Sequence, residues 1–259
     1  MNKWVQRSEE VANSPGYLDA LHKIYPVMHD DKRILSEDEI EELREIYERQ
    51  DDEELLWKLL KLPKFPINDP YVAFLRRKEG ALRDNPETVK RIASQIRKMG
   101  FDNIVKAIQQ PKEFNRQMGP LFRKWIEGLG YPLVSPEDLE RYEIALLKGG
   151  DKILLEFANN KLKCDLGKAP DFIIKVGKRY VIGEAKFLTD YGGHQYAQLK
   201  DALALLEQEK GEDVVCVAIL DGVVWISKKT KMYRRICELP QCKPVFTALL
   251  LQEFISTLK

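Results

Sequence analysis

A predicted β-hairpin constrains the fold of this chain more than any other feature. Its two segments, Asp171–Val176 and Arg179–Lys186, are apolar and rich in β-branched and aromatic residues. Gly177 and Lys178 lie between them and provide the residues of a tight turn. We therefore expect the two segments to pair as adjacent strands, with the start of the first beside the end of the second.

The polar side chains at this end of the hairpin form a candidate site. Side chains alternate along a strand, so Glu184 and Lys186 share one face while Ala185 points to the other. We expect Asp171, at the start of the partner strand, to face the same pair. Two carboxylates at close range repel each other, and a shared proton or a divalent cation relieves the repulsion. Oxygen ligands of this kind suit Mg²⁺, which takes further ligands from water and substrate phosphate, so the pattern favours phosphodiester hydrolysis.

This arrangement resembles the core of the PD-(D/E)XK nuclease superfamily, and most closely its type II restriction endonucleases, over residues 111–230. The resemblance rests on Pro170-Asp171 and on Glu184-Ala185-Lys186. It implies that Asp171, Glu184 and Lys186 are catalytic. It also implies that Asp171, Glu184 and the backbone carbonyl of Ala185 bind Mg²⁺, with Mn²⁺ as a substitute, while Lys186 assists the attacking water.

A Glu-x-Lys triplet alone is weak support, because 32% of the residues are charged. The alternative is a surface hairpin with incidental charges. The context favours the nuclease interpretation: the triplet ends an apolar strand, an acid opens the preceding strand, and a glycine loop and an amphipathic helix follow.

The segment after the motif is a candidate DNA contact. Gly192 and Gly193 precede a predicted helix, whose apolar stripe comprises Tyr196, Leu199, Leu203 and Leu206. The polar residues of its first turn lie off this stripe, where free N–H groups attract phosphate and where Gln can read a base edge. The alternative is that they cap and solvate the helix. The predicted DNA contacts of this segment are Tyr191, His194, Gln195 and Gln198.

A second predicted helix, Phe114–Tyr131 with Pro120 near its first turn, resembles the first helix of the nuclease core. Many superfamily members carry a metal-binding Glu there, but Arg123 occupies that position in this chain. Glu127, one turn later, is the candidate replacement; the alternative is a solvated helix charge. The remaining candidates for DNA contact are Arg116, Gln117, Arg123 and Lys124 on this helix, and Lys228, Lys229 and Lys231 in a later basic run.

The net charge of +1 hides a strong asymmetry. Ser36–Glu54 holds eleven acids and two bases, a local charge of −9, while Arg76–Lys124 holds thirteen bases and five acids. Basic clusters of this kind suit contact with a nucleic-acid backbone.

The periodicity divides the chain into a mostly α-helical N-terminal region, residues 1–110, and a catalytic core, residues 111–259. The expected fold class is α/β, a restriction-endonuclease-like core with a mixed central β-sheet flanked by helices. Predicted helices are Glu37–Tyr47, Glu53–Leu62, Pro70–Arg77, Pro86–Gln110 and a closing Pro244–Leu258. Predicted strands besides the hairpin are Ile153–Phe157, Val214–Leu220 and Val223–Ser227, the last two joined by a turn at Asp221-Gly222.

Other chemistries find little support in the sequence. The four cysteines contain no C-x-x-C pair, and no phosphate-binding or dinucleotide glycine pattern occurs. No apolar run has the length that spans a membrane and the N-terminus lacks a signal-peptide core, so we expect a cytoplasmic protein without a membrane partner.

The expected function is Mg²⁺-dependent, site-specific cleavage of double-stranded DNA that leaves 5′-phosphate ends. Each site cuts one strand, so a homodimer would match a palindromic target, and a cognate DNA methyltransferase is an expected partner. The helical region would dimerise, clasp the duplex, or do both. The alternatives are a structure-selective repair nuclease or resolvase, and an inactive DNA-binding protein of the same fold.

Overall fold

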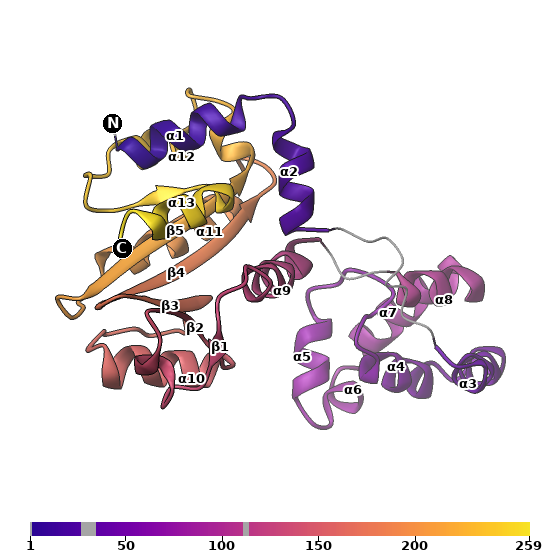
Figure 1. The fold of residues 1–259 in the computed structure, drawn as a ribbon. Helices are drawn as coiled ribbons and strands as arrows, with labels where there is room; N and C mark the ends of the chain where they lie inside the picture. The colour runs from indigo at the N-terminus through magenta and orange to yellow at the C-terminus, as the bar shows by residue number, and fades with distance from the viewer. Residues whose placement is uncertain (1, 27–34, 111–113) are drawn as a thin grey trace. The chain divides into compact units, whose positions relative to one another are not determined.

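A computed structural model describes residues 2–26, 35–110 and 114–259, and divides them into two compact units (Figure 1). The core unit takes the described parts of residues 1–27 and 113–259, and the helical unit takes those of residues 28–112. Each unit has its own cluster of buried apolar side chains. The expected boundary at residue 110 therefore changes, because residues 2–26 pack with the core unit.

The core unit is built around a six-stranded mixed sheet with strand order β1-β2-β3-β4-β5-β6. The pairs β2–β3 and β3–β4 are antiparallel and the others are parallel. The expected mixed sheet of an α/β protein is thus confirmed. The strands are β1 Leu133–Val134, β2 Ile144–Leu147, β3 Phe172–Val176, β4 Arg179–Leu188, β5 Val214–Gly222 and β6 Val245–Phe246.

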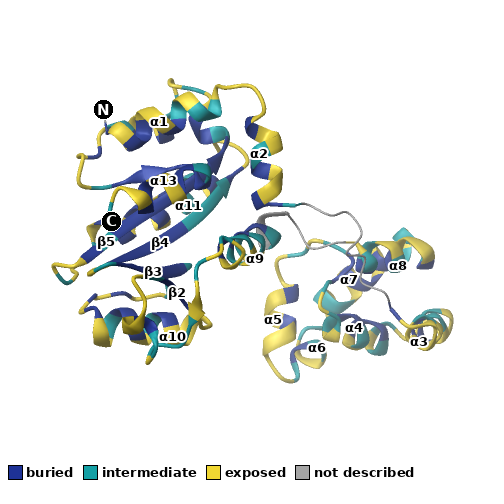
Figure 2. Cartoon of the chain, in the orientation of Figure 1, coloured by how far each residue is buried: buried dark blue, intermediate teal, exposed yellow. Residues whose placement is uncertain are grey.

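The predicted hairpin is the antiparallel pair β3–β4, in which Phe172 lies opposite Gly183 and Val176 opposite Arg179. β4 also pairs with β5 from Tyr180 to Leu188. These central strands are buried over most of their length (Figure 2). Their nearly continuous apolar sequence follows from being covered on both faces.

Helices cover the sheet. α11 packs on β4 and β5, α9 packs on β4, and α1 packs on β6. The helices of this unit are α1 Lys3–Ala12, α2 Tyr17–Ile24, α9 Phe114–Glu127, α10 Asp151–Glu156, α11 Gly193–Ala204, α12 Lys231–Cys237 and α13 Leu251–Ser256. Single turns are η1 Leu139–Arg141, η2 Phe157–Lys161, η3 Leu205–Glu207, η4 Val223–Trp225 and η5 Ala248–Leu250.

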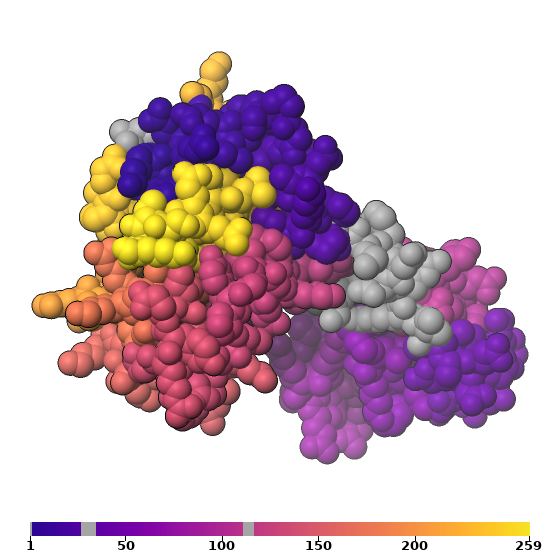
Figure 3. Space-filling model, in the orientation of Figure 1, coloured from indigo at the N-terminus to yellow at the C-terminus, as the bar shows by residue number. Residues whose placement is uncertain are grey.

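The N-terminal segment is fastened to the C-terminal part of the chain. The side-chain amide of Asn2 donates hydrogen bonds to the carbonyls of Pro240 and Lys243. The ring of Trp4 packs against Phe246 and Phe254. Figure 3 shows the two chain ends side by side on the surface. The sequence analysis placed these residues in the N-terminal region and predicted no helix before Glu37, so α1 and α2 and their packing on the core are additions from the structure.

A buried acid, Asp221, joins α2 to the end of β5. The Tyr25 hydroxyl donates to Asp221 Oδ2 at 2.7 Å, and the Thr247 hydroxyl and the Ala248 N–H donate to Oδ1. Burial raises the pKa of Asp221 to about 6, although the hydrogen bonds act to lower it. Gly222 follows with a φ of 89°, and the chain then enters η4. The predicted turn and strand at residues 221–227 are therefore wrong, because the acid extends β5.

Three further predictions about secondary structure differ from the structure. Ile153–Phe157 lies in α10 and the start of η2, because a short apolar run does not distinguish a strand from a buried helix. Pro244–Leu258 contains β6, η5 and α13 in place of a single helix. The helix predicted over Phe114–Tyr131 does begin at Phe114, but Pro120 lies inside it and not in its first turn, and it ends at Glu127.

The helical unit confirms most of the predicted helices. Its elements are α3 Glu37–Glu48, α4 Asp52–Lys61, α5 Val72–Arg77, α6 Ala81–Asp84, α7 Pro86–Met99 and α8 Phe101–Gln109. The predicted long helix breaks at Gly100, whose φ is 78°. Ser36 and Glu39 form a capping box at the start of α3. Across both units, the described helices include none with the length and apolarity needed to cross a membrane.

The raised pKa of Asp221 predicts a specific dependence of stability on pH. The folded protein binds this proton more tightly than the unfolded chain, so the stabilisation is present at low pH and is lost as the pH rises through about 6. The unfolding free energy of the wild type minus that of Asp221→Asn should fall by about 3 kcal/mol from about pH 4 to pH 7. Denaturant titration of both proteins at each pH measures this difference. A constant difference would contradict an ionisable carboxyl buried here.

Candidate active site

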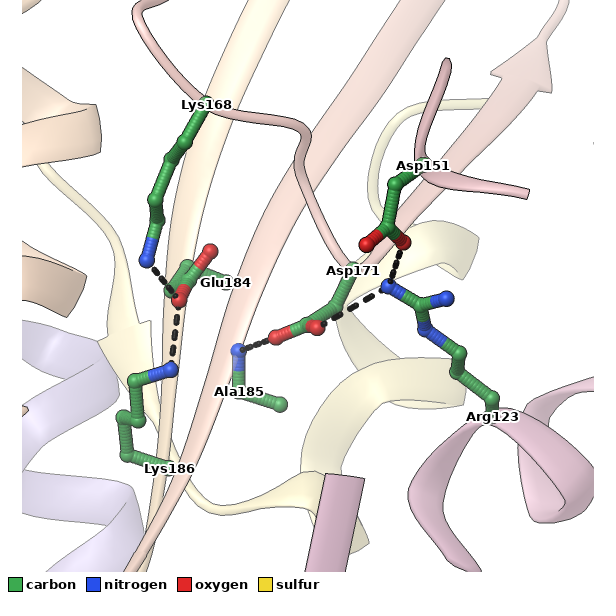
Figure 4. Close-up of polar contacts among 7 residues, drawn as sticks. All are labelled: Arg123, Asp151, Lys168, Asp171, Glu184, Ala185 and Lys186. Atoms are coloured by element: carbon green, nitrogen blue, oxygen red, sulfur yellow. Dashed lines mark hydrogen bonds and ion pairs between the residues drawn. The ribbon is translucent and has the colours of Figure 1, made fainter. Parts of the chain in front are cut away.

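Asp171 is fixed to the strand that carries the other two motif residues. Its backbone N–H donates to the Gly183 carbonyl at 2.8 Å, and its Oδ2 accepts a hydrogen bond from the Ala185 N–H, also at 2.8 Å (Figure 4). The structure thus brings together Asp171, Glu184 and Lys186, as the hairpin pattern predicts.

Glu184 is a nearly buried carboxylate held between two ammonium groups. Its side chain is only 4% exposed. Its Oε1 accepts hydrogen bonds at 2.6 Å from Nζ of Lys186 and, equally, from Nζ of Lys168. An isolated buried charge is strongly unfavourable, so two cations at this oxygen explain how Glu184 can remain inside the fold.

Arg123 stands beside the other carboxylate. Its guanidinium lies 3.7 Å from Asp171 Oδ1 and 2.6 Å from Oδ1 of Asp151, at the start of α10. Burial, followed by repulsion from Glu184, raises the pKa of Asp171, and the Ala185 N–H, Lys186 and Arg123 oppose that rise. The repulsion between two acids inferred from the sequence is therefore present. Arg123 thus supplies positive charge beside Asp171.

Gly183 allows the hairpin to close tightly under the site. A Cβ added to Gly183 would lie 2.1 Å from the ring of Phe172, its partner across β3–β4. Only glycine leaves room for this ring, which is 2% exposed. The Phe172 ring also packs at a tilt of 45° against Phe122 of α9, so the packing ties α9 to the hairpin that carries Glu184.

The donor set fits a hard divalent cation. Asp171 and Glu184 offer carboxylate oxygens that face Lys and Arg side chains and, at Asp171, the Ala185 N–H. A cavity of about 260 Å³ opens beside Glu184 and gives space for solvent. The described residues contain no group of three or more His, Cys, Asp or Glu side chains that could hold a metal, so Glu127, which is exposed, adds no third acid. A cation here would complete its coordination with water and phosphate, as Mg²⁺ commonly does.

The structure corrects the prediction that Gln195 contacts DNA. Its side chain is 2% exposed, donates to the Thr189 hydroxyl at 3.0 Å and accepts from the Thr189 N–H at 3.3 Å. Gln195 lies four residues before the buried Leu199, on the same face of α11. Its role is to close the loop before the helix.

The other predicted DNA contacts lie at or near the surface. Tyr191 is exposed and donates to the Val223 carbonyl, and His194 contacts Gln198 at 3.1 Å. Lys228 pairs with Glu9, Lys231 lies over the ring of Tyr196, and Lys229 and Lys124 are exposed. Gln117 is half-buried, and the side chain of Arg116 lies outside the described residues.

Two site residues escaped the sequence analysis, Lys168 and Asp151. Lys168 stands three residues before Asp171, in the loop leading to β3, and a cation so close to the motif is the signal that could have identified it. Asp151 is connected to the site by its ion pair with Arg123, and no local pattern in the sequence indicates that contact.

One comparison identifies the family. The family model of the Tsp45I type II restriction enzyme matches residues 2–258, nearly the whole chain. The chain belongs to this family. It is therefore a type II restriction endonuclease, a site-specific deoxyribonuclease that binds DNA, as the motif resemblance implied. Type II restriction enzymes generally use divalent metal ions. Searches of curated proteins and of solved structures found no match to this restriction enzyme.

Proposed function

We propose that this restriction enzyme hydrolyses phosphodiester bonds of double-stranded DNA with Mg²⁺, leaving 5′-phosphate and 3′-hydroxyl ends, at a PD-(D/E)XK site formed by Asp171, Glu184 and Lys186. The arrangement of charge carries this proposal. A carboxylate that is 4% exposed lies between two ammonium groups, beside a second carboxylate whose pKa is raised. Membership of a restriction enzyme family supports sequence-specific cleavage over the alternatives of structure-selective repair and of an inactive binding protein.

Asp171, Glu184 and the backbone carbonyl of Ala185 would hold the metal. Bound there, Mg²⁺, or Mn²⁺ in its place, would lower the pKa of a bound water and polarise the scissile phosphate. The hydrogen bond from the Ala185 N–H keeps the Asp171 carboxylate at the sheet edge near Glu184. Arg123 restrains the other oxygen of Asp171, and so acts as a positioning residue.

Lys186 would orient the attacking water and stabilise the phosphate as negative charge develops. Its ammonium is held at Glu184 Oε1, but the side chain remains 23% exposed and thus open to a substrate. Lys186 is fixed by β4, a central strand paired on both sides, so its position depends little on loop motion.

Lys168 would supply a second ammonium at the same carboxylate. Burial alone would lower the pKa of Lys168, but its hydrogen bond to Glu184 and the surrounding acids together raise it. Lys168 thus stays charged and compensates Glu184. Its side chain is 57% exposed, so it can also reach a DNA phosphate beside the site.

DNA contacts beyond the scissile phosphate are proposed for the surface side chains around the site. They are Tyr191, His194 and Gln198 near the start of α11, Arg116, Gln117, Arg123 and Lys124 on α9, and Lys228, Lys229 and Lys231 around the start of α12. A cognate DNA methyltransferase would protect host DNA at the recognition sequence.

Replacing the motif lysine tests the proposal directly. Lys186→Ala should reduce cleavage of phage or plasmid DNA by at least about a hundredfold, because it removes a charge that stabilises the transition state. Its affinity for DNA in Ca²⁺ should be nearly unchanged. Gel electrophoresis of the products, with Mg²⁺ or EDTA, gives the readout.

Discrete fragments that require both Mg²⁺ and Lys186, with 5′-phosphates detected by end-sequencing, would support the proposal. Wild-type cleavage that persists in EDTA would contradict the metal requirement. Cleavage confined to branched DNA would instead favour the repair alternative.

Replacing Lys168 should slow cleavage less than replacing Lys186 does. Lys168→Ala should lower kcat by about tenfold to a hundredfold, while Lys168→Arg, which keeps the charge, should recover most of the activity. Lys178→Ala, at the turn of the same hairpin, is a matched surface control and should cleave like the wild type. Single-turnover cleavage on a fixed substrate compares the four proteins. Equal rates for Lys168→Ala and Lys178→Ala would remove Lys168 from the site.

We propose that the enzyme acts as a homodimer, because one such site cuts one strand and a palindromic target presents two equivalent bonds. Sedimentation of the protein with a duplex that carries its recognition sequence should give two protomers per duplex. A single protomer per duplex would contradict this assembly.

A further inference from the structure

The surface of the helical unit carries a hollow of about 690 Å³. Its walls come from α4, α5 and α6 and from the turn between the last two. We call it the arginine hollow, after the most frequent charged residue in its lining. Its cationic side chains are Lys61, Arg76, Arg77, Lys78 and Arg83, and its acidic ones are Glu53 and Glu79. This excess of positive charge gives the hollow an affinity for an anionic partner.

Two of its arginines have no partner among the described residues of the unit. Arg77 and Arg83 are exposed, and neither forms a hydrogen bond or an ion pair with any residue in the described ranges. By contrast, Lys78 lies 3.6 Å from Asp84, and Arg76 donates to the Leu62 carbonyl. A guanidinium has five donors arranged to grip phosphate oxygens, so an unpartnered pair beside a hollow of this size favours a phosphate ligand.

An exposed aromatic side chain lines the same hollow. Trp57 is 47% exposed, whereas Trp4 and Trp225 in the core unit are 6% and 0% exposed. The Lys61 ammonium lies over its ring. Tyr71 and Phe74, on the neighbouring α5 segment, are more than half exposed. Aromatic rings next to cations are typical of surfaces that pack against sugars and bases.

Acidic and basic residues of the helical unit are concentrated in different parts of its sequence. Residues 36–54 have a net charge of −9, and residues 55–110 contain twelve bases and five acids. The hollow is formed mostly by the second stretch, with Glu53 as the acid from the first. Asp51, Glu53 and Glu54 lie on the other side of Trp57, so the positive charge is concentrated on the α5 and α6 side of the hollow.

We propose that the arginine hollow binds the sugar-phosphate backbone of the DNA substrate, with Arg77 and Arg83 contacting phosphates and Trp57 packing against the sugar or base. This proposal gives the helical unit a defined contact in DNA recognition. It depends on the enzyme acting on DNA, but not on the roles proposed for Asp171, Glu184 or Lys186.

The test compares two double variants with equal loss of charge. Arg77→Ala/Arg83→Ala removes the unpartnered arginines of the hollow. Lys90→Ala/Lys106→Ala removes two exposed lysines of α7 and α8, which do not line it. Anisotropy of a labelled duplex of arbitrary sequence, in EDTA, gives the dissociation constant at several salt concentrations. Circular dichroism verifies that both variants fold.

The arginine variant should bind at least about tenfold more weakly and lose about 2 from the slope of log affinity against log salt, one for each phosphate contact. The lysine variant should bind within about twofold of the wild type, since distant charges are screened. If both variants bound DNA equally weakly, the loss of affinity would follow from net charge alone, and the proposal would be overturned. Unchanged DNA affinity of the arginine variant would overturn it as well.

Fluorescence gives an independent readout. DNA should quench the emission of the wild type, and Trp57→Phe should lose most of that change, because Trp57 lines the proposed contact. Unchanged quenching in Trp57→Phe would contradict a contact at the hollow. If the arginine variant alters the oligomeric state in sedimentation while DNA affinity is unchanged, the hollow serves self-association and the proposal fails. Lys186→Ala should bind DNA normally, so a loss of DNA binding in the arginine variant can be distinguished from a failure of the proposed catalytic site.

Discussion

The structure of the core unit depends on keeping a carboxylate charged while it is nearly removed from water. Desolvation of Glu184 would be prohibitive without compensating charge, and the fold provides it from two directions: β4 carries Lys186, and the loop before β3 carries Lys168. The carboxylate of Asp171 is likewise stabilised, by a hydrogen bond from the Ala185 N–H and by the nearby guanidinium of Arg123. The site thus combines two largely buried carboxylates with cations from the hairpin, from the loop before it and from α9.

A second buried acid holds the periphery of the same unit together. Asp221 accepts hydrogen bonds from Tyr25 of α2 and from Thr247 near the C-terminal helix. It therefore connects β5 with segments that are distant in sequence. The two acids have different surroundings: Glu184 is matched by cations, whereas hydroxyl and amide donors surround Asp221. The first arrangement leaves charged groups at the carboxylate, whereas the second joins segments of the fold through neutral donors.

The sequence predicted those parts of the fold that depend on local patterns. The hairpin, most helices of the helical unit and the meeting of Asp171 with Glu184 and Lys186 follow from alternation, turn residues and spacing. The contacts of Lys168 and Asp151 depend on how loops return to the sheet, which local patterns do not encode. Gln195 was misplaced because the buried stripe of α11 begins one residue earlier than its apolar residues suggest. Residues 2–26 were placed with the helical region because the contacts that fasten Asn2 to the core come from residues more than two hundred positions away.

The core unit is discontinuous in sequence, and this affects how the enzyme can be made. Residues 35–110 form a compact body between two parts of the core, so the ribosome can complete the helical unit early. In the core unit, by contrast, the first helix α1 packs against late parts of the chain, because Asn2 and Trp4 contact residues between Pro240 and Phe254. A chain that has not yet reached residue 240 would therefore lack the partners of its own first helix. The packing of α1 is thus one of the last steps in the assembly of the core unit, although α1 is the first helix to be synthesised.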